Sequence, residues 1–143
     1  MPRLGILNIL LGFSSIFLAS AAGPIIASDM TKTYFQDPNL WQNWQSTLLS
    51  SSHGHTNLMG IIQILLGLTL PYSRIPTSLK VWQTAGSSLG TLAMGPMLTI
   101  RALQGPVQHL DWLEVTFGIC ASAYLASLGI HLYGLTAKLI RPL

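Results

Sequence analysis

Two histidines separated by one glycine, His53 and His55, are the side chains of this 143-residue chain best suited to metal chemistry. Asn57, Met59 and Gly60 follow them in a stretch without charged residues. Imidazoles are costly inside a hydrophobic segment unless they have partners, so a functional role is the first hypothesis. The alternative is a buried histidine pair that hydrogen-bonds to serine, threonine or backbone groups.

The available ligands narrow the kind of metal site. A structural zinc site needs four ligands, usually with thiolates, whereas the chain has one cysteine, Cys120. A di-iron site in a helical bundle needs Glu-x-x-His pairs, which the sequence lacks. Haem iron needs only one imidazole and a flat apolar pocket. The sequence therefore favours haem b, with His53 as the metal ligand.

Helical spacing assigns the polar residues to faces. At about 100° per residue, His53, Asn57 and Gly60 share one face, and His55 points almost to the opposite side. Asn57 is the candidate catalytic residue, and Met59 would be soft lining. In the loop after the third apolar segment, a further histidine could reach a haem propionate. The expected cofactor contacts are His53, His55, Asn57, Met59 and His109.

A second axial histidine is not expected. His131 would lie roughly 18 Å from His53 along the helix axis, too far for both to bind one iron. Single-histidine ligation with an open or weakly filled sixth position is therefore favoured. Iron of this kind can bind a small ligand or act as a Lewis acid.

The composition predicts an integral membrane protein. Half of the residues are hydrophobic and 8% are charged, against roughly 25% charged in soluble domains. The net charge of +3 is thinly spread, which excludes a nucleic-acid interface. A bilayer needs about 20 apolar residues per helix. The sequence predicts one all-α domain over residues 1–143, a four-helix transmembrane bundle with spans at about 4–27, 45–70, 79–103 and 112–137, and a loop at 28–44.

The charges predict the orientation. One side of a four-span protein would carry Arg3, Arg74, Lys80, Lys138 and Arg141, and the other side all the acidic residues. The positive-inside rule then places both termini in the cytoplasm, as in a multi-pass protein of a bacterial inner membrane. Alternatively, the first span with Ala19-Ser20-Ala21 could be a cleaved signal peptide.

Small residues recur along the first, third and fourth spans, which is typical of close helix packing within or between subunits. Pro96 lies within the third span and is expected to kink it.

The segment from His53 to Pro71 resembles the styrene oxide isomerases and their relatives, which are membrane haem proteins. In that family a histidine seven residues before a glycine opens a span that ends in an apolar run and a proline. Here these residues are His53, Gly60 and Pro71. Weaker similarities are Gly86-Ser87 and Ala123-Tyr124-Leu125.

The resemblance implies a homotrimer with haem b near the subunit interfaces, held by His53. Ferric iron acts as a Lewis acid on an epoxide oxygen, and a hydride shift gives an aldehyde. The family's catalytic asparagine falls on Met59, and Asn57 stands two residues earlier. The family also carries a tyrosine and an aspartate in the third span, and residues 79–103 contain neither.

Three functions are open at this point. The first is a non-catalytic haem protein, such as a small cytochrome, a gas or redox sensor, or a haem carrier. The second is a haem Lewis-acid isomerase of epoxides or similar small apolar substrates that enter from the lipid. The third is a non-haem structural subunit. The expected partners are membrane lipid, further copies of the chain and a small apolar ligand.

Overall fold

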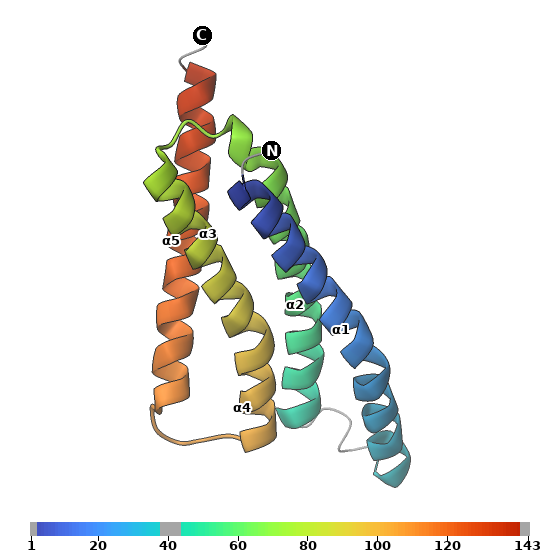
Figure 1. Ribbon diagram of the computed structural model, residues 1–143. Helices are drawn as coiled ribbons and strands as arrows, with labels where there is room; N and C mark the ends of the chain where they lie inside the picture. Colours follow the sequence, from blue (N-terminus) through green and yellow to red (C-terminus); the bar gives the residue numbers. More distant parts are fainter. Residues whose placement is uncertain (1–2, 38–43, 141–143) are drawn as a thin grey trace.

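The computed structural model describes residues 3–37 and 44–140, which are almost entirely helical. In chain order the elements are α1 (Arg3–Gln36), α2 (Trp44–Thr69), the 3-10 turn η2 (Leu70–Tyr72), α3 (Thr77–Leu92), the π-helical turn η3 (Ala93–Met97), α4 (Leu98–Gln104) and α5 (Trp112–Ile140). Because α3, η3 and α4 are continuous, these ranges form four long rods (Figure 1). No strand occurs within them, so the all-α class is confirmed.

The observed helices match three of the predicted spans, and the first span differs. The predicted loop at 28–44 is wrong in its first part, because α1 continues to Gln36. No glycine or proline stands between Pro24 and Asp37 that could stop the helix earlier. The helix ends where Asp37 precedes Pro38, since a residue before proline disfavours the helical conformation.

Two helices in the described ranges, α1 and α5, are long and apolar enough to cross a membrane. Helix α1 has 34 residues and is about 51 Å long, which exceeds a bilayer core of about 30 Å. Helix α2 carries a polar stretch at 50–57, and α3 has 16 residues before the π turn begins. Polar content in α2 and the interruption of the third rod therefore distinguish them from α1 and α5.

The rods form an open row. Helix α1 packs mostly along α2, and α5 packs mostly along α3, while η3 and α4 contact α2. The start of α1, the α2–α3 connection and the end of α5 lie at one end of the molecule (Figure 1). Toward the other end α4 stays beside α2, whereas α1 and α5, the outer helices of the row, diverge from them (Figure 1).

Polar side chains lie inside this row and apolar side chains outside. Asn8, Gln83 and Ser87 are completely buried, and Gln63 is 1% exposed. Large apolar side chains on the surface include Phe17, Ile25, Leu125, Leu132 and Leu139. Apolar side chains such as Leu66 and Leu70 are buried beside the polar ones, so the interior is mixed, whereas buried polar residues are the exception in water-soluble proteins.

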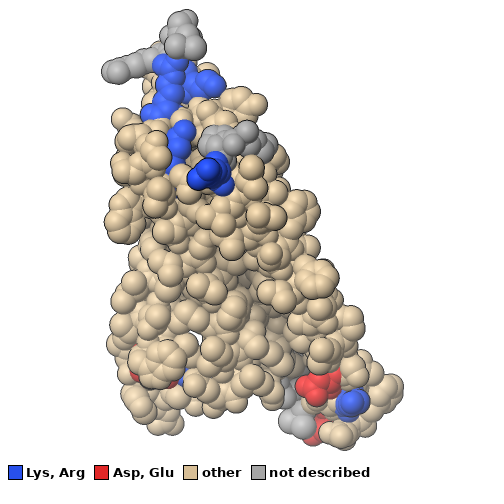
Figure 2. Space-filling model, in the orientation of Figure 1, with Lys and Arg blue, Asp and Glu red and all other residues tan. Residues whose placement is uncertain are grey.

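Charged residues gather at the two ends (Figure 2). The end with the α2–α3 connection carries Arg3, Arg74, Lys80 and Lys138. The opposite end carries Asp29, Lys32, Asp37, Arg101, Asp111 and Glu114. The long middle part between these ends has no charged side chain in the described residues.

Glycine pairs bring α1 and α2 together at a seven-residue spacing. A methyl group on Gly5 would lie 2.8 Å from the carbonyl oxygen of Gly67, and one on Gly12 would lie 2.5 Å from that of Gly60. Neither contact leaves room for a side chain, so the two backbones touch directly. Since His53 precedes Gly60 by seven residues, this glycine seam leads toward the histidine.

Candidate functional site

His53 lies in α2 on the wall of a cavity of about 430 Å³ between α1, α2 and the η3–α4 part of the third rod. The surface is hollowed between the lower halves of α1 and α4 (Figure 2). The lining residues are Ser15, Leu18, Ala19, Ala22, Ile26, Ser52, His53, Thr56, Thr91, Leu92, Gly95, Pro96, Thr99 and Ile100. The size is within the usual range for ligand pockets, roughly 300–1,000 Å³.

The His53 ring has one nitrogen with a weak donor and one without a partner. The side-chain amide nitrogen of Asn57 lies 3.4 Å from Nε2 and also donates to the His53 carbonyl at 3.1 Å. Because an amide N–H can only donate, Nε2 faces it with its lone pair, and the neutral ring carries its proton on Nδ1. Nδ1 is buried and has no hydrogen-bond partner in the described part of the chain.

The cavity wall is apolar in effect, although it includes five hydroxyl groups. Ser15, Thr56 and Thr91 each donate to a backbone carbonyl of their own helix, and Ser52 and Thr99 hydrogen-bond to each other at 2.7 Å and to the Gly95 carbonyl. These bonds turn the hydroxyl protons away from a ligand. Among the described lining residues, His53 is thus the one side chain with a basic nitrogen.

The π-helical turn shapes the wall opposite His53. Pro96 lacks a backbone N–H and interrupts the regular helix, as the sequence predicts, although the result is a π turn within one rod. Ser52 on α2 donates to the Gly95 carbonyl at 2.8 Å. A methyl group on Gly95 would lie 2.5 Å from the Thr56 hydroxyl. The turn is therefore held tightly against the segment of α2 that carries His53.

Of the five predicted cofactor contacts, His53 lines this cavity, and Asn57 contacts His53 without being among the described lining residues. The Nδ1 atom of His55 lies 2.8 Å from the Ser51 carbonyl and 3.1 Å from its hydroxyl, so its own helix satisfies it. Met59 is buried away from the described lining residues. His109 is exposed in the α4–α5 loop and is likewise absent from that lining. The structure thus brings together His53 and Asn57 and separates them from the other three.

His131 occupies a second, closed polar cluster. Its Nδ1 lies 2.7 Å from the Gln83 amide nitrogen, and its Nε2 lies 2.8 Å from the Thr69 hydroxyl. Thr69 uses its proton on the Leu65 carbonyl, so it accepts from His131 Nε2–H. Both ring nitrogens are therefore occupied.

A buried amide pair, which the sequence analysis missed, connects three rods nearby. Gln63 donates to the side-chain oxygen of Asn8 at 2.8 Å, and Asn8 donates to the Thr84 hydroxyl at 3.1 Å. The signal was available, because Asn8 and Gln63 are the uncharged amides within otherwise apolar stretches of their helices. Like the His131 cluster, this pair holds helices together.

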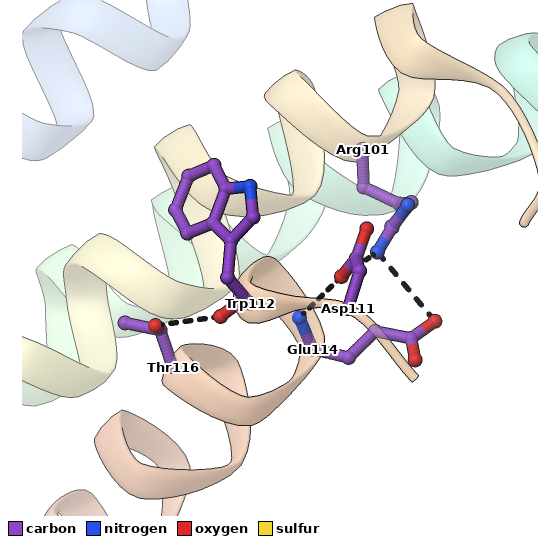
Figure 3. Close-up of polar contacts among 5 residues, drawn as sticks. All are labelled: Arg101, Asp111, Trp112, Glu114 and Thr116. Carbon is purple, nitrogen blue, oxygen red and sulfur yellow. Dashed lines mark hydrogen bonds and ion pairs between the residues drawn. The ribbon is translucent and has the colours of Figure 1, made fainter. Parts of the chain in front are cut away.

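An ion-pair cluster fixes the α4–α5 connection (Figure 3). Arg101 is buried and donates to Asp111 at 2.6 Å, and it lies 3.5 Å from Glu114. Asp111 also accepts the backbone N–H of Glu114 and so caps the start of α5. The hydrogen bond from Arg101, and then that from Glu114, hold the pKa of Asp111 below its ordinary value of 3.8.

No group of three or more histidine, cysteine, aspartate or glutamate side chains that could hold a metal ion occurs among the described residues. Comparison of the chain with family models, with curated proteins and with solved structures found no match. The resemblance to styrene oxide isomerases therefore stays a prediction from the sequence.

Proposed function

We propose that this chain is a multi-pass integral membrane protein in which all four rods cross the bilayer. The distribution of side chains supports this, because apolar residues cover the outside and amides and hydroxyls fill the inside. A helix in lipid needs its polar groups satisfied internally, and the contacts of Asn8, Gln63 and His131 do so. The polar stretch of α2 would then face protein instead of lipid.

The charged ends support an orientation with both termini in the cytoplasm. The basic residues at the end with the α2–α3 connection obey the positive-inside rule if that end is cytoplasmic. The cavity beside His53 then lies in the outer half of the bilayer. By resemblance to the styrene oxide isomerases, the membrane is a bacterial inner membrane and the protein a homotrimer.

Within this frame we propose that the protein binds haem b through His53. The observation that carries the proposal is an imidazole on the wall of an apolar cavity whose Nε2 lone pair accepts only a long hydrogen bond, 3.4 Å from the Asn57 amide nitrogen. Ala19, Ala22 and Gly95 are small residues in that wall, which suits a flat macrocycle. When bound, haem would supply an iron atom with one position left for a small ligand.

The residues of the chain would bind and shield this group. His53 would supply the nitrogen ligand. Asn57 donates weakly to Nε2 and keeps it unprotonated, and the bond to iron would replace this hydrogen bond because the nitrogen has one lone pair. The back-bonded hydroxyls of the wall leave the ligand in an apolar environment that excludes water. None of the described lining residues is an acid, so a non-catalytic haem protein is favoured over an isomerase. The isomerase remains the second candidate because the cavity could hold a small apolar substrate beside the iron.

An absorption spectrum of the purified full chain, loaded with hemin in detergent, tests this function. A histidine-bound haem gives a strong Soret band, which should be lost in His53→Ala and kept in His55→Ala. The His55 variant is a matched control because that ring lies two residues away and bonds to its own helix. A Soret band that survives His53→Ala would overturn the assignment of the ligand.

The same protein separates the remaining functions. A panel of aryl and alkyl epoxides should be left unchanged by a non-catalytic haem protein, and conversion to aldehydes would establish the isomerase. Absence of any Soret band in the wild type would exclude both haem functions and leave a structural membrane subunit. A trimer should be detected by light scattering of the detergent complex, corrected for bound detergent.

A further inference from the structure

Gly23 of α1 lies directly against the His53 ring. A methyl group on Gly23 would lie 3.0 Å from Cε1, 3.6 Å from Nε2 and 3.7 Å from Nδ1 of that ring. The backbone of α1 thus faces the ring edge at Cε1, between the two nitrogens. No other glycine in the described ranges has the nearest atoms to its missing side chain on a histidine.

This contact lies one helical turn beyond the glycine seam between α1 and α2. The seam pairs Gly5 with Gly67 and Gly12 with Gly60; at the same spacing the next positions are Ala19 and His53, and Gly23 follows Ala19 by four residues. A ring at this position is far larger than the hydrogen atom of a glycine. For α1 to stay close, it must present a residue without a side chain, and Gly23 does so.

The local sequence of α1 at this contact is unfavourable for a helix. Glycine in a helix interior costs about 1 kcal/mol relative to alanine, and proline about 3 kcal/mol. Gly23 and Pro24 are adjacent within α1. Pro24 removes one backbone hydrogen bond at this level. Toward its C-terminal end α1 diverges from α2 (Figure 1).

We propose that Gly23 is a positioning residue that fixes the orientation of the His53 imidazole. Helix α1 at Gly23 confines the ring at Cε1, and Asn57 confines it at Nε2. Between them the two contacts set the direction of the Nε2 lone pair. The inference rests on the proposed haem site for its functional meaning, but the ring orientation exists without haem and is measured separately.

The test compares three glycine-to-alanine variants of the full chain in detergent, labelled with nitrogen-15 at histidine. Gly23→Ala should shift the ring nitrogen resonances of His53, which are assigned by their loss in His53→Gln. It should also weaken hemin binding about tenfold, as is usual when a residue that orients a metal ligand is changed. A purely structural role would not shift the ring resonances selectively.

Two controls separate ring positioning from helix packing. Gly12→Ala disturbs the same helix pair at Gly60, so it should lower the unfolding temperature and leave the His53 resonances in place. Gly118→Ala places a methyl group in open space on α5, so it should leave the His53 resonances in place and should not lower the unfolding temperature. If all three variants give wild-type ring resonances, the proposal is overturned, whatever their hemin affinities.

A double variant keeps the proposal testable if Gly23→Ala does not fold. The three atoms nearest to the new methyl group all belong to the His53 ring, so Gly23→Ala should be tolerated better in a His53→Ala background. Equal loss of folded protein in both backgrounds would contradict the proposal. A wild type that binds no hemin would defeat the proposed function, while the ring resonances of Gly23→Ala would still decide the role of Gly23.

Discussion

His53 and His131 are both histidines within helices of one membrane-type fold, and their surroundings are opposite. Both ring nitrogens of His131 have partners within 2.8 Å, from two other rods. The Nε2 atom of His53 has a donor at 3.4 Å, its Nδ1 atom has no described partner, and a cavity adjoins the ring. A histidine in an apolar helix is therefore a candidate ligand site where its ring is only weakly hydrogen-bonded and a cavity adjoins it.

Helix packing explains the difference. Near His131 the helices approach closely, since a methyl group on Gly86 would lie 2.6 Å from the Ala123 carbonyl oxygen. Near His53, Pro96 lies in the π-helical turn of the third rod, and Pro24 removes a hydrogen bond within α1. The half of the molecule with the α2–α3 connection is thus closed around its histidine, and the half with the α4–α5 connection is open.

The largest effects on stability and on hemin binding are expected when His131 and His53 are replaced by alanine in separate variants. His131→Ala removes a large buried side chain and leaves Gln83 without a partner, so it should lower the free energy of unfolding by about 3 kcal/mol. Hemin binding should persist. His53→Ala should have the opposite profile, because removing an unsatisfied Nδ1 offsets much of the lost packing. Denaturant titration followed by tryptophan fluorescence measures the stability, and the Soret band measures the binding.

The contrast between His53 and His131 would be contradicted if either alanine substitution strongly lowered both the free energy of unfolding and the binding of hemin. Loss of hemin binding in a folded His131→Ala variant would mean that the polar cluster of His131 with Gln83 and Thr69 contributes to the ligand site. In that case the closed and open halves could not be assigned separate roles.

Gly12→Ala tests the glycine contacts that bring α1 and α2 together. The added methyl group would lie 2.5 Å from the Gly60 carbonyl oxygen, and overpacking of this kind should cost about 2 kcal/mol. Gly118→Ala is the control, since open space surrounds that position. Thermal unfolding by circular dichroism compares them, and equal melting temperatures would show that the α1–α2 approach is adjustable.

The sequence was sufficient to predict the rods and one part of the site. Apolar length and breaker residues place the rods closely, and the pairing of His53 with Asn57 follows from their four-residue spacing on one helix. The end of α1 was predicted too early because loss of apolar character does not stop a helix. The helix continues until Asp37 precedes Pro38.

Contacts between helices could not be predicted in this way. Gly23 touches His53 only because α1 runs antiparallel to α2 in one particular register. His55 and Met59 are close to His53 in sequence, but helical rotation turns them toward other neighbours. His109 lies in a connection whose position depends on the Arg101–Asp111 ion pair. Each of these depends on a register or a loop position that one helix alone does not determine.

Thr69→Val sharpens the description of the closed half. The variant keeps the shape of the side chain and removes the acceptor of the His131 Nε2–H. Hydrogen bonds between membrane helices contribute about 0.6 kcal/mol on average, and a loss of that size is expected in the denaturant titration. Thr116→Val is the control, because its exposed hydroxyl bonds only to the Trp112 carbonyl of its own helix (Figure 3). A much larger loss for Thr69→Val would mean that His131 has no alternative partner.

The smallest effect is expected at the end of the open half, where Arg101 binds Asp111. Because the folded pKa of Asp111 is lowered, the ionised carboxylate stabilises the fold above its ordinary value of 3.8, and this contribution is lost as the pH falls through the folded pKa. Asp111→Asn should therefore make the melting temperature fall less as the pH is lowered into the acidic range. Arg101→Gln should have a similar effect, because it removes the main cause of the lowered pKa. If the melting temperature of both variants falls at acidic pH as steeply as that of the wild type, this ion pair does not hold α4 and α5 together at their connection.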